Sequence, residues 1–530
     1  MPSTANTNMP DRRNRHIAML GHLPDHQRDR ILSGMRWTVW LSALAIPFSM
    51  SVNLLLARVG PETIGVYGLL SVYIGLTSAF LYFGGDTVVM RYIPECRPED
   101  RASFLLSYLL VILAVMSGCI AFSWFCPAAI RLAFGDTHGG RFNFLLLCLS
   151  VVPITFAMVV ASLKGMLEIQ AAQLLTKLLT IGSLAIYAAI FVFDRSLLSI
   201  HPTAIIWSVY LGLSAVLGVI GAVKVARLFR TPRLRWLLPA GFWPYALSTQ
   251  QVSISSFLVR RLDYVLIVNL GGLSLLGQYV AVMLVAVVVP NVSEFFMDTL
   301  LPALTNTVAE RNYAGAAQVF MMHMRLLFLA TTVIGCAVSV LAVPATVIMG
   351  AKYASLGGLI ILMAAANGIA SPGAAGGTLL AAIGRQQLAV WARVLNLCLF
   401  VFLFLPLWRR WNLTGAVLAC AISLVISHVI LMAVALRTAR IFPSISGLWL
   451  KAATVQAMVC SVALWWMPLG FTSAALTWLG AMVLFLWWAR YDRSEIRGLA
   501  HTFFPGIAGL LATSPERSVT TPVKPRIVSL

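Results

Sequence analysis

Two arginines and an aspartate lie deep inside an apolar stretch of this sequence, where charge is costly. Residues 242–270 read FWPYALSTQQVSISSFLVRRLDYVLIVNL, with Arg260, Arg261 and Asp263 well past the middle. In a helix with ~1.5 Å rise per residue, Arg260 lies on the order of 20 Å beyond Tyr245, inside a hydrocarbon layer ~30 Å thick. Guanidinium groups bind phosphate oxygens bidentately, so this chemistry suits a diphosphate, and Asp263 can hold Arg260 when the site is empty.

The charged residues continue a polar stripe along the same helix. Steps of four, three, four and three residues place its members on one helical face: Thr249, Ser253, Ser256, Arg260 and Asp263. Such a face points toward other helices or a water-filled cavity rather than lipid. Two alternatives remain open, a helix that ends at Val259 and a permanent Arg260–Asp263 bridge that locks two helices. Arg261 points off the stripe.

The sequence contains no constellation typical of an enzyme or a metal site. Its histidines are isolated, no HExxH, DxD or GxSxG motif occurs, and the eight cysteines form no CxxC pair. His428 stands alone in an apolar span, where we expect a helix-packing role rather than a proton relay. We therefore expect no catalytic residue, no metal and no cofactor.

The composition is that of a polytopic, all-α membrane protein. The 530 residues are 60% hydrophobic and 11% charged, with a mean hydropathy of +0.88, whereas soluble domains average about 25% charged residues. The net charge of +20 comes without an arginine-rich arm interleaved with aromatic residues, so nucleic acid is not an expected partner. The apolar runs predict twelve to fourteen transmembrane helices.

The two halves of the chain are related by a direct repeat. Residues 60–67 and 272–279 share the pattern G-x4-G-x-Y, and the same offset superposes Asp86-Thr87 on Asp298-Thr299. A direct repeat six spans apart predicts two pseudo-symmetric six-helix lobes around an axis along the membrane normal, with the site between them. It also makes Gly271-Gly272 the turn between the seventh and eighth helices.

Most lysines and arginines lie in the two terminal segments and in the loops on the same side of the membrane as the termini. Because such residues concentrate on the cytoplasmic side, we expect both termini to be cytoplasmic. The predicted organisation is a basic cytoplasmic segment (1–35), an N-terminal lobe with the inter-lobe loop (36–235), a C-terminal lobe (236–440), helices thirteen and fourteen (441–490) and a cytoplasmic tail (491–530).

A second charged group marks the predicted inner ends of the helices. Glu294 and Asp298 follow Asn291 at one and two turns, and Asp86 holds the equivalent place in the first half. Further charges lie on nearby inner segments: Arg91, Lys164, Glu168 and Lys177. We expect ion pairs across the lobes that form an inner gate. Solvated loop charges are an equal alternative, and proton or cation coupling through Glu294 or Asp298 is a weaker one.

Several stretches resemble the bacterial polysaccharide flippases, the Wzx-like family of the multidrug/oligosaccharidyl-lipid/polysaccharide exporter (MOP) superfamily. The first half contributes LLLARVGPETIGVYGLL (54–70) and DTVVMRYIPE (86–95). The second half contributes RRLDYVLIVNLGGLSLLGQYVAV (260–282), GAKYASLGGLIILMAA (350–365), LLAAIGRQQLAVWARVLN (379–396) and NLTGAVLACAIS (412–423).

The resemblance implies a V-shaped transporter of the bacterial inner membrane, with both termini cytoplasmic. It would flip undecaprenyl-diphosphate-linked oligosaccharide units for exopolysaccharide, O-antigen or capsule by alternating access. Expected partners are that lipid, membrane lipid and other membrane proteins of polysaccharide assembly. Arg260, Arg261 and Asp263 match the family's charged position in the seventh helix, with Ser253 and Ser256 beside them, and Arg91 matches the arginine after the second helix.

Three alternatives remain at this point. A multidrug or toxic-compound extruder of the same superfamily should carry acids rather than arginines at depth. A lipid II flippase has a similar fourteen-helix count, but we find fewer arginines at membrane depth than it would need. A membrane polysaccharide polymerase or ligase, from another functional class, typically needs a large outer loop, and the longest outer loop, near residues 125–141, is short.

Overall fold

The regular structure of the chain is helical wherever the structure describes it. The computed structural model describes residues 48, 50–126, 128, 140–166, 168–229, 235–291, 293, 297, 300, 304, 308, 313–439, 445–465 and 471–489. The predicted cytoplasmic segments 1–35 and 491–530 lie outside them. The helices are α3 (Pro61–Leu76), η1 (a π-helical turn, Thr77–Leu81), α4 (Gly85–Glu95), α5 (Arg101–Phe125), α7 (Gly140–Leu149), α8 (Val151–Gly165), α9 (Ile169–Phe193), α10 (Arg195–Ile200), α11 (Pro202–Leu228), α12 (Phe242–Ala286), α14 (Tyr313–Met349), η2 (Ala351–Leu356), α15 (Gly357–Ala370), η3 (Ser371–Gly373), α16 (Ala374–Ala382), α17 (Gln386–Ala439), α18 (Ile445–Trp465) and α19 (Phe471–Ala489).

Ten of the described helical stretches are long and apolar enough to cross a membrane, and two shorter apolar helices accompany them. Two of the ten hold a sharp break and therefore contain two crossings each. Gly272, with φ 75°, interrupts α12, and Asn412, with φ 46°, interrupts α17. A positive φ is easy for glycine and tolerated by asparagine, so both residues suit a tight turn between antiparallel helices. With these two breaks the long described stretches supply twelve crossings, within the predicted range of twelve to fourteen, and the predicted turn at Gly271-Gly272 is confirmed.

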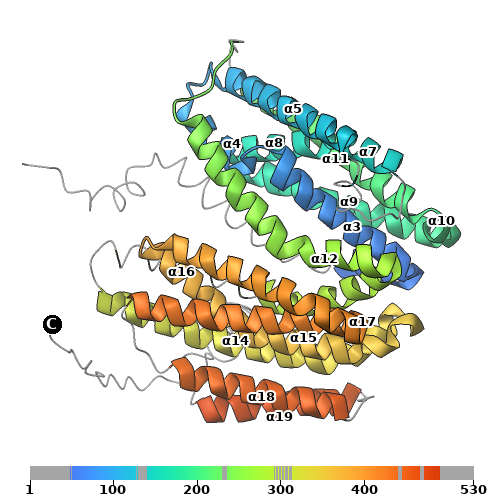
Figure 1. The fold of residues 1–530 in the computed structure, drawn as a ribbon, viewed down its shortest axis with the longest axis vertical. Helices are drawn as coiled ribbons and strands as arrows, with labels where there is room; N and C mark the ends of the chain where they lie inside the picture. Colours follow the sequence, from blue (N-terminus) through green and yellow to red (C-terminus); the bar gives the residue numbers. More distant parts are fainter. Residues whose placement is uncertain are drawn as a thin grey trace, which may run out of the picture.

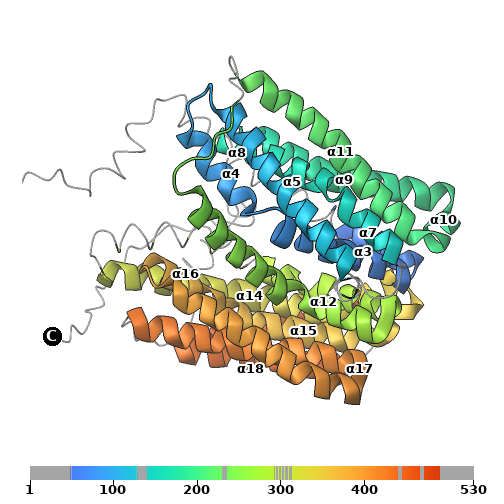
Figure 2. The ribbon, with the colours of Figure 1, turned by 45° about the horizontal axis from the view of Figure 1, so that its top comes forward.

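The helices form two lobes that diverge toward one end, as a V. Helices α3 to α11 make the N-terminal lobe and α14 to α17 the C-terminal lobe, with α12 between them and α18 and α19 on the outer side (Figure 1). The divergence persists when the molecule is turned by 45° (Figure 2). We call the end near Gly60, Gly272 and Asn412 the closed end. The open end is the one at which α12 and α17 begin.

The closed end is one hydrophobic core shared by both lobes. Ile64 and Leu69 of α3 belong to the same buried cluster as Leu276 and Tyr279 of α12 and Phe404 of α17.

The helices of the closed end approach most closely at two repeat-related glycines. A methyl group on Gly65 would clash with the Leu273 carbonyl, and one on Gly277 would clash with the Pro61 carbonyl. Because Pro61 and Leu273 are themselves repeat-related, the contact is nearly symmetric about the axis that the sequence repeat predicts.

The open end of the N-terminal lobe has a separate core. Tyr92, Phe104 and Tyr108 pack there against Phe242, the first residue of α12. The start of α12 is therefore built into the N-terminal lobe, although the sequence assigns it to the second half.

Helices α18 and α19 are fastened to the C-terminal lobe by polar side chains within apolar surroundings. The indole Nε1 of Trp449 donates to Ile369 O at 2.8 Å, and that of Trp478 donates to Val333 O at 3.0 Å. Interhelical hydrogen bonds of this kind hold membrane helices together where the hydrophobic effect does not.

Candidate functional site

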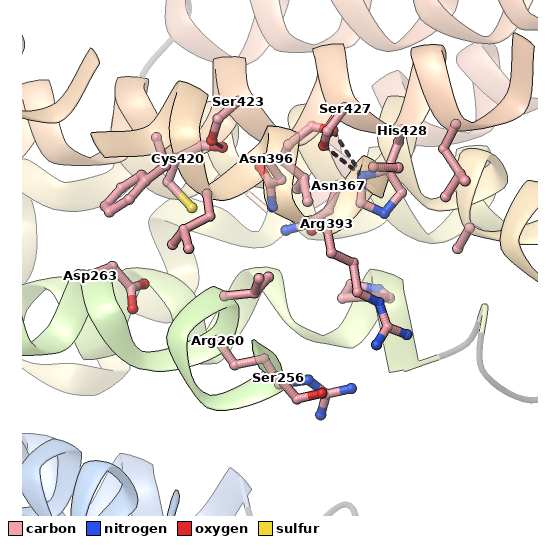
Figure 3. A pocket seen from close by; sticks show the side chains of 18 of the residues that line it. Ser256, Arg260, Asp263, Asn367, Arg393, Asn396, Cys420, Ser423, Ser427 and His428 are labelled. Atoms are coloured by element: carbon pink, nitrogen blue, oxygen red, sulfur yellow. Dashed lines mark hydrogen bonds between the residues drawn. The ribbon is translucent and has the colours of Figure 1, made fainter. Parts of the chain in front are cut away.

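A pocket of about 550 Å³ lies between the first half of α12 and helices α15 to α17. This volume is in the range of ordinary ligand sites. Most of its polar lining residues are labelled in Figure 3: Ser256, Arg260 and Asp263 on α12, Asn367 on α15, and Arg393, Asn396, Ser423, Ser427 and His428 on α17. Arg261 on α12 and Asn291 just after it also line the pocket.

Arg260 lines this pocket with an exposed side chain. No ion pair joins it to a carboxylate among the described residues. Arg393 of α17 is also exposed, and in Figure 3 the two guanidinium groups reach toward the same space from the two helices. Two guanidiniums that share one space and have no carboxylate partner among the described residues suit the binding of an anion.

Arg261 has a different environment from its neighbour. Its guanidinium lies over the ring of Tyr264, 5.1 Å from the centroid, and its aliphatic stem lies near Gly75 of α3. The predicted divergence of the two arginines is thus seen, with Arg261 at the edge of the pocket next to the N-terminal lobe.

Asp263 is bonded to the second half of its own helical hairpin. Tyr279 OH donates to its Oδ2 at 2.7 Å, and the backbone N of Tyr264 donates to its Oδ1 at 2.9 Å. A permanent Arg260–Asp263 bridge, which the sequence left open, is not among the ion pairs of the described residues. The carboxylate instead ties the two crossings of α12 together across the Gly272 turn, which leaves Arg260 available.

Arg393 and Asn396 are pocket residues that the sequence analysis missed. Both lie near the start of the eleventh span, where a basic residue reads as the end of a helix. A more accurate position for the start of this helix would have identified Arg393, because α17 begins at Gln386 and Arg393 lies two turns inside it. Asn396 follows one turn later on the same face.

His428 was expected to pack between helices, and the structure places it on the pocket wall. Its Nδ1 lies 2.9 Å from Leu424 O. Since a carbonyl can only accept, Nδ1 carries a proton in this contact. Figure 3 shows His428 on the same wall as Arg393.

The structure describes three of the predicted gate residues, Asp86, Arg91 and Lys164, and it brings two of them together. Asp86 and Lys164 both line a second cavity of about 270 Å³ inside the N-terminal lobe, with Tyr82 and Thr176. This geometry brings Asp86 and Lys164 together within one lobe rather than across the V. Glu294 and Asp298 lie outside the described residues.

Arg91 and Ser253 lie where the N-terminal lobe meets α12. The Arg91 guanidinium stacks over the ring of Tyr245 at 4.1 Å and lies 3.7 Å from Glu95 in an exposed ion pair. Ser253 faces the start of α4, because a methyl group on Gly85 would lie 4.0 Å from its Oγ. Of the two serines predicted beside the arginines, only Ser256 lines the large pocket.

The described part of the chain also holds no group of three or more histidine, cysteine, aspartate or glutamate side chains that could bind a metal ion. All eight cysteines are free.

An all-helical membrane protein with two lobes in a V and a polar pocket between them defines a class of transporter-like folds. No protein-family model matches this sequence, and no curated protein matches it significantly. Solved structures do match. The lipid II flippase MurJ in an inward closed conformation has a TM-score of 0.66 at 13% identity, covering 85% of this chain and 97% of that one.

Two further structures agree. An inward-facing multidrug resistance MATE family transporter of the MOP superfamily has a TM-score of 0.59 at 12% identity, covering 74% of this chain and 94% of that one. A MOP superfamily transporter from Pyrococcus furiosus, described as having a binding pocket of reverse polarity, has a TM-score of 0.52 at 12% identity, covering 78% and 95%. The chain therefore has the MOP superfamily fold.

Proposed function

We propose that this protein is a flippase that moves a polyprenyl-diphosphate-linked oligosaccharide across the bacterial inner membrane, for exopolysaccharide, O-antigen or capsule assembly. The observation that carries the proposal is the pair Arg260 and Arg393, which face one pocket without a carboxylate partner among the described residues.

The pocket chemistry supports an anionic, sugar-bearing ligand. Two guanidinium forks match the oxygens of a diphosphate, and charge-assisted hydrogen bonds of this type are about twice as strong as neutral ones. Asn367 and Asn396 add amide donors and acceptors that suit sugar hydroxyl groups. A lateral opening between the lobes would let the polyprenyl chain stay in lipid while its head group enters the V.

The open end is proposed to face the cytoplasm. Segments that the sequence predicts to be cytoplasmic lie there, among them residues 96–100 between α4 and α5 and residues 383–385 before α17. The structure would then be an inward-facing state, ready to receive a lipid-linked sugar made on the cytoplasmic side. Alternating access requires the closed end to part and the open end to close.

The fold likeness leaves other MOP-type substrates as competitors. A multidrug extruder for cationic compounds would need a free acid in the pocket, whereas Asp263 is bonded to Tyr279. A lipid II flippase shares the diphosphate chemistry, and the likeness to MurJ gives it support that a polymerase or ligase lacks. The identity of the sugar on the transported lipid would distinguish a lipid II flippase from a flippase for polysaccharide units.

Mass spectrometry of lipids from cells without this gene tests the proposal. We expect undecaprenyl-diphosphate carrying one complete oligosaccharide repeat to accumulate. The wild-type gene should clear it, Arg260→Ala and Arg393→Ala should not, and Arg409→Ala, an exposed arginine on the same helix as Arg393 but at the closed end, should clear it.

Three other results would contradict the proposal. Normal lipid pools with new drug sensitivity would favour an extruder, accumulated lipid II would identify a lipid II flippase, and a truncated sugar chain would indicate an assembly enzyme.

A further inference from the structure

Gln250 is a buried glutamine in the first half of α12 that bonds to the N-terminal lobe through its whole amide. Its Oε1 accepts a hydrogen bond from Gly84 N at 2.9 Å, and its Nε2 donates to Ala79 O. A glutamine amide offers both a donor and an acceptor, and here both are directed at the backbone of one other segment.

That segment is the interruption between α3 and α4. The π-helical turn η1 closes with a bond from Tyr82 N to Thr77 O at 2.9 Å, five residues apart. Gly84 N and Ala79 O are also five residues apart and could have formed a second π-type hydrogen bond. Instead, each of them bonds to the Gln250 amide. The helical geometry ends at Tyr82, with ψ 80°, and Gly84, with φ 76°, precedes the first residue of α4. Buried backbone groups left unpaired by such a break cost about 1–3 kcal/mol each, so Gln250 stabilises the interruption.

Other contacts fix the same half-helix to the same lobe. Phe242 lies 5.9 Å from Tyr108, and Phe257 meets Phe80 edge to face with ring centroids 5.9 Å apart. Ala246 lies against Gly84 closely enough that a methyl group there would touch it at 3.2 Å. From Phe242 to Phe257, this helix packs on the N-terminal lobe over four turns.

We infer that Gln250 is a positioning residue that makes the first half of α12 a rigid part of the N-terminal lobe. Arg260, less than one turn beyond Phe257, then moves with that lobe, while Arg393 on α17 moves with the other. The anion pocket is thus divided between the two moving bodies, although the sequence repeat assigns both arginines to the C-terminal half. Resting on the proposed function, a diphosphate bound by both arginines connects the lobes and draws the open end together.

Distances between spin labels in the full-length protein test this division. Labels attached through noncanonical amino acids keep the native cysteines and can be placed at three exposed residues: Leu106 on α5, Leu247 on α12 and Val390 on α17. Without ligand, we expect a narrow distance distribution between 106 and 247 and a broader one between 247 and 390. Inorganic pyrophosphate should shorten the second distance and leave the first unchanged.

The adjacent glutamine supplies a matched control for the role of Gln250. Gln250→Leu removes both hydrogen bonds and should broaden the 106–247 distribution, while Gln251→Leu, on an exposed position, should leave it narrow. If Gln250→Leu does not fold, Gln250→Glu keeps the acceptor for Gly84 N but, when ionised, loses the donor to Ala79 O. It should broaden the distribution less.

The outcomes separate this inference from the proposed function. A 106–247 distance that varies while 247–390 stays fixed would overturn the inference, as would a Gln250 variant whose 106–247 distribution equals that of the wild type. Calorimetry with pyrophosphate tests the anion site itself. Absence of binding would count against the proposed function, while the ligand-free distances would still decide the rigid attachment of α12.

Discussion

The two ends of the V are built on opposite principles. At the closed end, Gly65 and Gly277 bring two helix backbones into contact inside a core that both lobes share. Between the diverging lobes, Arg260 on α12 and Arg393 on α17 face one polar pocket. The closed end combines apolar packing with close backbone contact at two glycines, whereas the two pocket arginines have no carboxylate partner among the described residues. On the proposed function, an anion that binds both arginines would draw the open end together.

The largest effect is expected from filling the glycine crossing. Gly277→Leu places a side chain against the Pro61 carbonyl, which cannot move without shifting α3. Overpacking of this kind costs roughly 1–3 kcal/mol or more, so we expect reduced abundance and loss of transport. Gly118→Leu is the control, because nothing lies within 4 Å of a methyl group there. Equal abundance and transport for both variants would contradict a tight closed end.

Removal of the pocket arginines should abolish transport while sparing the fold. Arg260→Ala and Arg393→Ala each delete an exposed charge, so abundance should stay near wild type. Loss of a charge-assisted hydrogen bond of about 1.5–3 kcal/mol predicts a roughly tenfold to hundredfold weaker interaction with the diphosphate. Binding of pyrophosphate by calorimetry measures this loss. Arg409→Ala should bind normally, and weak binding by that control would point to a general charge effect.

A smaller effect, on stability rather than transport, is expected at Asp263. Tyr279→Phe removes the 2.7 Å hydrogen bond to the carboxylate and should lower the free energy of unfolding by about 1.5 kcal/mol. Thermal denaturation in detergent reports the change. The repeat-related variant Tyr67→Phe is the control, since Tyr67 has no carboxylate partner among the described residues.

Exchange of Arg260 and Asp263 tests whether Asp263 acts as an ion-pair partner of Arg260 or as the hydrogen-bond partner of Tyr279. Arg260→Asp combined with Asp263→Arg preserves a bridge between the two positions but destroys the Tyr279 contact. We expect lower stability and no transport. Recovery of wild-type abundance by the exchange would mean that the two residues do form a structural pair.

The smallest effect is expected at the rim of the closed end. Arg58 Nε donates to Ile348 O across the lobes at 2.8 Å, in an exposed position. Arg58→Gln should cost less than about 1 kcal/mol, a few-fold change in the balance between inward and outward states. Labelling of a cysteine placed at this rim would show it. A loss of transport as large as that of Gly277→Leu would mean that polar contacts rather than backbone packing hold the closed end.

The sequence predicted features that depend on local pattern or on the repeat. The apolar spans and the Gly272 turn follow from periodicity and internal similarity, whereas the contact between the repeat-related glycines Gly65 and Gly277 is seen only in the structure. Arg260 was found because an arginine is conspicuous in an apolar span. Its partner Arg393 was not, because a charge near the start of a span looks like an ordinary helix boundary.

Features that depend on tertiary contacts could not be derived in the same way. The hydrogen bond between Asp263 and Tyr279 joins residues on either side of the Gly272 turn, and local spacing favoured the nearer Arg260. Gln250 reads as one more polar residue on a helix. Its role depends on the π-helical turn that follows α3, and residues 77–81 contain no glycine or proline that would predict this turn.

Transport by the purified protein in vesicles tests the central claim most directly. The substrate would be the lipid-linked oligosaccharide extracted from cells that lack the gene, and its appearance in the outer leaflet would be measured by periodate oxidation of exposed sugars. We predict that the wild-type protein and Arg409→Ala move the lipid and that the double variant Arg260→Ala/Arg393→Ala does not. Equal movement by the double variant, with the protein folded, would contradict the account of a diphosphate site shared between the two lobes.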